Sequence, residues 1–134
     1  MTKLPLIPSE IELKQILLVE DELDLSEILR DFLNESGWTV TTSSSLSDAQ
    51  ERLLSTKWDC VLLDLHLADG STEELVKKIR AHGTTPIVLM TGVLGTEAET
   101  KIQDYLHGVL AKPFAISELM KLLSQIILRH KTIA

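Results

Sequence analysis

The chain has 134 residues, 44% of them hydrophobic, and a formal net charge of −7. This length suits one domain with a sizeable core and leaves no room for a second core of similar size. The acidic balance argues against direct nucleic-acid binding, because affinity for a phosphate backbone depends on clustered lysine and arginine. We therefore expect a single globular domain that does not bind nucleic acid directly.

The cysteine content and the ends of the chain bear on its location. Cys60 is the only cysteine, so an internal disulfide is impossible and a reducing compartment is consistent. The opening apolar patch is interrupted by two prolines and is too short for a signal-peptide core, and no stretch is long enough to span a bilayer. We expect a cytoplasmic protein without membrane insertion. Its domain should cover residues 14–130, between an N-terminal extension (1–13) and a C-terminal tail (131–134).

Short apolar runs alternate with segments of helical period along the domain. The runs rich in Leu, Ile and Val are typical of strands buried on both faces, and the apolar residues between them recur with the spacing of one helix face. The expected strands cover residues 15–20, 38–43, 60–64, 86–90 and 108–112. The expected helices cover residues 22–37, 46–55, 71–83 and 96–106, and a last one begins near Ile116. Three helices open with pairs placed as capping boxes, namely Ser47 with Gln50, Ser71 with Glu74, and Thr96 with Glu99.

The strict alternation of strands and helices implies a particular architecture. Right-handed crossovers between parallel strands place helices on both faces of one sheet. The predicted fold is therefore a doubly wound α/β fold, with a parallel sheet of five strands and with five helices. Such sheets bind ligands beyond the carboxyl ends of their strands, where the strand order reverses.

Polar residues stand at those carboxyl ends, and the fold would bring them to one edge. They are Glu20 and Asp21 after the first strand, Asp64 at the end of the third, Thr91 and Gly92 after the fourth, and Lys112 and Pro113 after the fifth. Carboxylates held within a few ångströms repel one another, so they take up protons or recruit a cation. Hard oxygen ligands favour Mg²⁺, which keeps positions open for water and phosphate.

The same residues suit phosphoryl transfer. A carboxylate beside a metal ion can attack a phosphoryl group and form an acyl phosphate, which makes Asp64 the candidate phosphoacceptor. Lys112 and Thr91 would supply a positive charge and a hydroxyl donor for the phosphoryl oxygens. Gly92 would leave room for the phosphoryl group to approach.

Together these features make the chain resemble a response-regulator receiver domain over nearly its whole length, from Lys14 to about His130. The resemblance rests on Glu20, Asp21, Asp64, the dipeptide Thr91-Gly92, and Lys112 and Pro113 within the motif AKPF. It implies a flavodoxin-like sheet in the order 2-1-3-4-5. It also implies that a sensor histidine kinase or a histidine phosphotransfer protein phosphorylates the domain on aspartate.

The resemblance further implies details of the site. The main-chain carbonyl of His66, two residues after the phosphoacceptor, would bind the metal together with Glu20, Asp21 and Asp64. The peptide bond between Lys112 and Pro113 would be cis, a form that is inexpensive only before proline.

Three departures from the family pattern affect the expected output. Ala68 stands where a proline is frequent in the loop after the phosphoacceptor, and Val109 stands where many members carry Tyr or Phe. His66 and Val93 occupy the positions often linked to dephosphorylation rate. Because Val109 is too small for the usual aromatic switch, we expect activation to run through Thr91 and the loop after it. Output would be docking of an unidentified protein, on the face formed by the fourth helix, fifth strand and fifth helix.

Other readings compete with this signalling module, which is not expected to be an enzyme beyond its own phosphotransfer and dephosphorylation. An aspartyl-nucleophile phosphatase needs a second acidic residue two positions after Asp64, where His66 stands. A pseudo-receiver would keep the fold without phosphorylation, and intact Asp64 and Lys112 disfavour it. Glu20 and Asp21 could also form a solvated acidic turn that caps the first helix. A dinucleotide site is disfavoured, because no Gly-rich loop follows the first strand.

Overall fold

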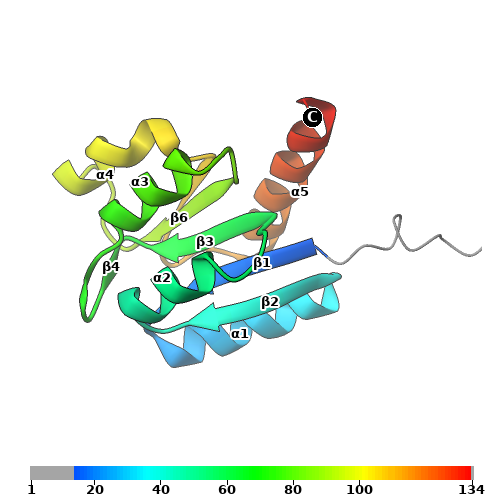
Figure 1. Ribbon diagram of the computed structural model, residues 1–134. Helices are drawn as coiled ribbons and strands as arrows, with labels where there is room; N and C mark the ends of the chain where they lie inside the picture. Colours follow the sequence, from blue (N-terminus) through cyan, green and yellow to red (C-terminus); the bar gives the residue numbers. More distant parts are fainter. Residues whose placement is uncertain (1–13, 134) are drawn as a thin grey trace, which may run out of the picture.

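The computed structural model describes residues 14–133, with side chains up to residue 127. Five parallel strands form one sheet in the spatial order β2-β1-β3-β6-β7 (Figure 1). They are β1 (Lys14–Val19), β2 (Trp38–Ser43), β3 (Cys60–Asp64), β6 (Ile87–Thr91) and β7 (Gly108–Ala111). Counted within this sheet, the order is 2-1-3-4-5, which confirms the doubly wound fold and the strand order predicted for it.

Helices cover both faces of the sheet. They are α1 (Leu23–Glu35), α2 (Leu46–Leu53), α3 (Glu73–Ala81), α4 (Glu97–Ile102) and α5 (Ile116–Ile133), with a 3₁₀ turn, η1 (Gln103–Tyr105), after α4. The last helix thus extends to Ile133, beyond the expected domain end at residue 130. Between residues 14 and 133, none of these helices combines the length and the apolar character that crossing a membrane requires.

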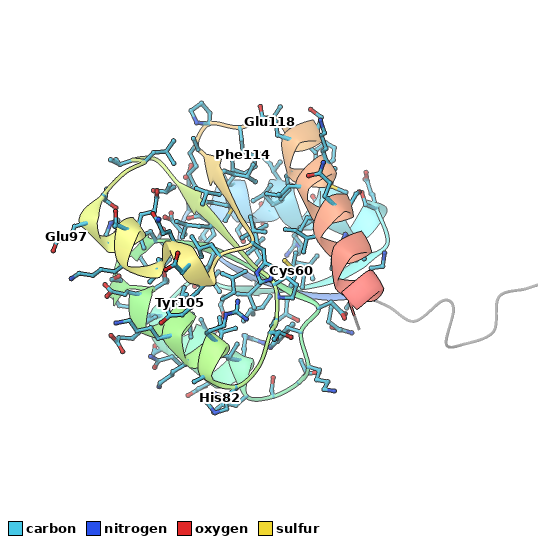
Figure 2. The ribbon with its side chains drawn as sticks, turned by 90° about the horizontal axis from the view of Figure 1, so that it is seen from above. Cys60, His82, Glu97, Tyr105, Phe114 and Glu118 are labelled. Carbon is cyan, nitrogen blue, oxygen red and sulfur yellow. The ribbon has the colours of Figure 1, made fainter. Side chains whose placement is uncertain are left out.

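Alternate residues of the central strands point to opposite faces of the sheet and belong to two separate hydrophobic cores. One core joins Ile16, Leu18, Leu62, Val88 and Met90 to side chains of α1 and α5. The other joins Leu17, Val19, Val61, Leu63 and Leu89 to side chains of α2, α3 and α4. The apolar runs are continuous because the strands are buried on both faces. Cys60 lies fully buried at the start of β3, near the middle of the molecule in Figure 2, whereas His82 and Glu97 lie at its edge.

The capping predictions had mixed outcomes. At α4 the Thr96 side chain accepts a hydrogen bond from the Glu99 N–H, as one half of the predicted capping box requires, whereas the Glu99 carboxylate accepts from the Gly95 N–H. At α2 the prediction was wrong, because Ser45 caps the helix by accepting from the Asp48 N–H, and Ser47 already lies inside it. Ser45 has the extended backbone that an N-cap needs.

The predicted capping box at α3 was also wrong. The helix begins one residue later, after Thr72, and the Ser71 hydroxyl accepts from the Glu73 N–H instead of from Glu74. A small antiparallel hairpin immediately before it, which the sequence did not indicate, shifts this start. The hairpin consists of β4 (His66–Leu67) and β5 (Gly70–Ser71), and it lies between β3 and α3.

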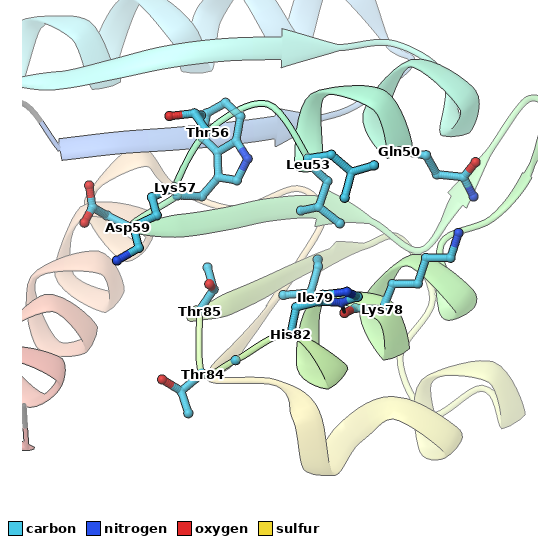
Figure 3. A pocket seen from close by; sticks show the side chains of 13 residues that line it. Gln50, Leu53, Thr56, Lys57, Asp59, Lys78, Ile79, His82, Thr84 and Thr85 are labelled. Atoms are coloured by element: carbon cyan, nitrogen blue, oxygen red, sulfur yellow. Dashed lines mark hydrogen bonds between the residues drawn. The ribbon is translucent and has the colours of Figure 1, made fainter.

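A cavity of about 700 Å³ lies between α2 and α3, at the end of the sheet where β3 and β6 begin. Figure 3 shows Gln50 and Leu53 of α2 on one side of it, with Lys78 and Ile79 of α3 on the other. Trp58 also lines the cavity, and its indole Nε1 is buried without a hydrogen-bond partner among the described residues. Leaving such a donor unsatisfied costs about 1–3 kcal/mol.

We predict that Trp58→Phe leaves the free energy of unfolding within about 1 kcal/mol of wild type, because loss of ring contacts is offset by removal of the unsatisfied donor. Trp58→Ala should cost roughly 2–4 kcal/mol, since it removes the ring's packing as well. Urea denaturation followed by far-UV circular dichroism measures both. Equal destabilisation by the two variants would show that the indole N–H itself stabilises the fold.

Candidate functional site

Three carboxylates meet at the carboxyl ends of the two central strands. Glu20 and Asp21 follow β1 directly, and Asp64 is the last residue of the neighbouring β3. One carboxylate oxygen from each lies within 4.8 Å of the others. The sequence placed these residues at one edge of the sheet, and the structure brings them together there.

Lys112 joins two of these carboxylates. Its Nζ donates hydrogen bonds to Glu20 Oε1 and to Asp64 Oδ2, the latter at 2.8 Å. The peptide bond between Lys112 and Pro113 is cis, as the resemblance implied. The Lys112 backbone N–H also donates to the Thr91 carbonyl at 2.7 Å, so the ends of β6 and β7 are joined beside the acidic cluster.

Burial dominates the electrostatics of Glu20, which is only 1% exposed. Burial raises the pKa of this carboxyl, and the charge of Asp64 adds to the rise, while hydrogen bonds from Lys112 and the Glu22 N–H oppose it. Burial of Lys112 disfavours its own charge, but hydrogen bonds to Asp64 and Glu20 overcome this effect and raise its pKa. The lysine is therefore the cation that makes these neighbouring carboxylates tolerable at the sheet edge.

Backbone groups of the loop after β3 organise the other side of the site. The Ala68 N–H donates to Asp21 Oδ2 at 2.8 Å, and the His66 N–H donates to Asp64 Oδ1 at 3.3 Å. The buried Thr72 hydroxyl donates to the Asp64 carbonyl at 2.8 Å. Sequence analysis did not find the roles of Ala68 and Thr72, because a backbone N–H carries no residue-type signal and Thr72 looked like any residue at a helix start.

The hydroxyl of Thr91 points into its own loop. Thr91 Oγ1 donates to the Val93 carbonyl at 3.0 Å and accepts from the Val93 N–H at 3.2 Å. Gly92 follows, and a Cβ built on it would meet no heavy atom within 4 Å among the described residues. The His66 side chain is exposed in the short hairpin, so it is its backbone that lies beside Asp64.

The arrangement can hold a divalent cation and a phosphoryl group side by side. Glu20, Asp21 and Asp64 offer only oxygen ligands, the donor set that Mg²⁺ prefers. Lys112 contacts Asp64 from within the same cluster and could turn to an anionic oxygen bound to that residue. The donor atoms of this cluster therefore fit Mg²⁺, the cation expected from the sequence.

Comparisons with known proteins agree with this chemistry. Residues 16–124 match the family described as the response regulator receiver domain, and the chain belongs to this family of two-component systems. The response regulator ArlR of Staphylococcus aureus is 33% identical over 117 residues, which are 87% of this chain and 53% of ArlR. The chain therefore spans about half the length of the curated relatives it matches.

Solved structures resemble the whole fold. A two-component response regulator from Clostridium difficile has a TM-score of 0.82 at 28% identity, over 87% of this chain and 98% of that one. The response regulator TrrA of Thermotoga maritima, crystallised in complex with Mg²⁺ and BeF, has a TM-score of 0.77 at 25% identity, over 85% and 99% of the two chains. A receiver domain from Methanospirillum hungatei has a TM-score of 0.87 at 18% identity, over 92% and 100% of the two chains, and this likeness concerns the fold alone.

We predict that Lys112→Met makes stability fall more steeply with rising pH than in wild type, measured in a chelator to exclude bound cations. Without its lysine partner, the buried Glu20 should have a still higher pKa, so above the ordinary value of 4.5 the folded state binds more protons than the unfolded state. Stability is then lost as pH rises through the folded-state pKa. Each unit of added pKa shift costs about 1.4 kcal/mol at pH 7.

Urea denaturation at pH 5 and pH 7 measures this slope, and Lys121→Met, which changes an exposed lysine of α5, is the matched control. The control should parallel wild type. If Lys112→Met also paralleled wild type, Lys112 would not be what compensates for the burial of Glu20.

Proposed function

We propose that the chain is a phosphorylatable switch that acts as the receiver of a response regulator. Asp64 accepts a phosphoryl group from a phosphohistidine of a sensor histidine kinase or a histidine phosphotransfer protein, in a reaction that depends on Mg²⁺. The observation that carries this proposal is the position of Asp64, between the Lys112 ammonium and the acidic pair after β1. A cytoplasmic location and a receiver that begins at residue 14 and includes α5 belong to the same proposal.

The transfer itself is a displacement at phosphorus. A carboxylate oxygen of Asp64 attacks the phosphorus, the bond from phosphorus to the histidine nitrogen breaks, and the nitrogen keeps the electron pair. The product is an acyl phosphate on Asp64. Lys112 then exchanges part of its contact with the Asp64 carboxylate for a phosphoryl oxygen, and it remains paired with buried Glu20.

Glu20, Asp21 and Asp64, with the main-chain carbonyl of His66, are the residues that would hold Mg²⁺. The cation supplies positive charge to the phosphoryl oxygens during transfer. Its support is the all-oxygen cluster within 4.8 Å, together with the complex of TrrA with Mg²⁺ and BeF. Asp21 is already oriented by the Ala68 N–H, so the site is partly preorganised.

The switch would run through Thr91. To donate to a phosphoryl oxygen on Asp64, its hydroxyl must give up the bond to the Val93 carbonyl, and this moves the loop before α4. Val93 and Leu94 in that loop are exposed, and so is Val109 on β7 at 39%. The loop and the face formed by α4, β7 and α5 are therefore the surface on which a protein partner would sense phosphorylation.

A phosphatase with an aspartyl nucleophile remains disfavoured. The residue two positions after Asp64 is His66, whose side chain is exposed in the hairpin and offers no carboxylic acid to the leaving group.

We predict one added phosphoryl group by intact mass after exposure to acetyl phosphate and Mg²⁺. The adduct should be absent without Mg²⁺ and in Asp64→Asn, because the amide is a poor nucleophile. Asp104→Asn, at an exposed carboxylate of η1, is the matched control and should be labelled like wild type. Unchanged labelling of Asp64→Asn would show that another residue is the phosphoacceptor.

A second prediction concerns the switch. Thr91→Ala should still accept the phosphoryl group, yet lose the phosphorylation-dependent change in amide exchange over residues 92–106, because the contact that moves the loop is gone. Val109→Ala should keep most of that change, since a small β-branched side chain has few alternative rotamers. Hydrogen exchange with and without phosphorylation measures both. If Val109→Ala abolished the change as fully as Thr91→Ala, the switch would run through β7.

A further inference from the structure

Asp69 caps a helix that begins more than twenty residues earlier in the chain. Its Oδ1 accepts from the Leu46 N–H at 2.8 Å, and its Oδ2 accepts from the N–H groups of Leu46 and Ser47 at 3.1 and 3.3 Å. Ser45 satisfies the next N–H of the helix, that of Asp48. The first N–H groups of a helix have no partner within the helix, so Asp69 supplies the acceptor that two of them need. The hydrogen bond from Leu46, and then that from Ser47, hold the pKa of Asp69 below its ordinary value.

The same short loop holds the acidic cluster. Ala68, the residue before Asp69, donates its N–H to Asp21 Oδ2 at 2.8 Å. Gly70, the residue after it, has a φ of +143°, and a Cβ there would lie 3.4 Å from a methyl carbon of Leu46. The positive φ favours glycine at position 70, and the 3.4 Å distance is an ordinary van der Waals contact that shows how near this loop lies to the start of α2. Two adjacent residues of this loop therefore contact different parts of the fold, Asp69 the start of α2 and Ala68 the acidic cluster.

We propose that Asp69 is a positioning residue of the acidic cluster: by fixing the loop after β3 to the start of α2, it holds the Ala68 N–H against Asp21. Orientation of a metal-binding carboxylate by outer hydrogen bonds typically changes metal affinity by about 10- to 100-fold. Asp69 does not contact Asp21 itself and acts through the Ala68 N–H, so we expect a smaller change in metal affinity. The cation in this inference is that of the proposed function, whereas the contact between Ala68 and Asp21 is independent of it.

The alternative is that Asp69 only stabilises α2. Ser45→Ala provides the matched control, because it removes another cap of the same helix turn that does not touch the loop after β3. Both Asp69→Ala and Ser45→Ala should lower the melting temperature of the protein to a similar extent. Only a positioning role predicts that they differ at the cluster.

The experiment compares wild type, Asp69→Ala, Asp69→Asn and Ser45→Ala by NMR, in the absence of any phosphodonor. Asp69→Ala should speed exchange of the Ala68 amide about tenfold and raise the Kd for Mg²⁺ about three- to tenfold. Ser45→Ala should leave both at wild-type values. Asp69→Asn keeps a side-chain oxygen as acceptor, so it should restore much of the Ala68 protection.

Coupling of this kind is reciprocal, so Mg²⁺ should slow amide exchange at Leu46 and Ser47 in wild type and not in Asp69→Ala. Equal effects of Asp69→Ala and Ser45→Ala on Ala68 would overturn the proposal and leave Asp69 as a helix cap. If wild type bound no Mg²⁺, the proposed function would fail, and the exchange of the Ala68 amide alone would still decide whether Asp69 positions the loop.

Discussion

The contact of Lys112 with Glu20 and Asp64 is the interaction on which the rest of the site depends. Glu20 lies almost fully buried at the end of a central strand, where an isolated carboxylate would be strongly disfavoured. Lys112 follows β7, at the far edge of the sheet from β2, and its ammonium compensates for the negative charge of both carboxylates. Because its charge is shared between two strands, the edge of the sheet can carry several acidic groups and still fold.

The single lysine compensates for the charge of these carboxylates only in part. With all three carboxylates ionised, one ammonium leaves an excess of negative charge that only a bound cation or a proton can offset. The backbone N–H groups of His66 and Ala68 orient two of the carboxylates without adding charge. The backbone N–H groups thus orient the carboxylates, whereas the side chains supply the charge of the cluster.

Much of this arrangement could be predicted from the sequence, because residue types and strand ends carry it. The apolar runs located the five strands of the sheet, and their alternation with helices placed Glu20, Asp21 and Asp64 at one edge. The capping residues of α2 and α3 were missed, since Ser45 and Ser47 offer the same chemistry and only the backbone selects between them. The β4–β5 hairpin was missed as well, because two residues in each strand are too few for a period. The role of Asp69 was missed too, because no pattern in the sequence told which distant N–H groups its carboxylate would meet.

The burial of Cys60 makes its reaction with thiol reagents a probe of local opening in this molecule. Burial raises the pKa of the Cys60 thiol to about 12, so the reactive thiolate form is scarce at neutral pH, and the side chain lies in the core that the sheet forms with α1 and α5. Because it is the only cysteine in the chain, alkylation reports on a single site, and the reagent reaches that site only when the core around it opens. The rate at which a thiol reagent modifies the native protein therefore follows the opening of this core, in which α1 and α5 cover one face of the sheet. Fraying of the loops around the acidic edge should leave that rate unchanged.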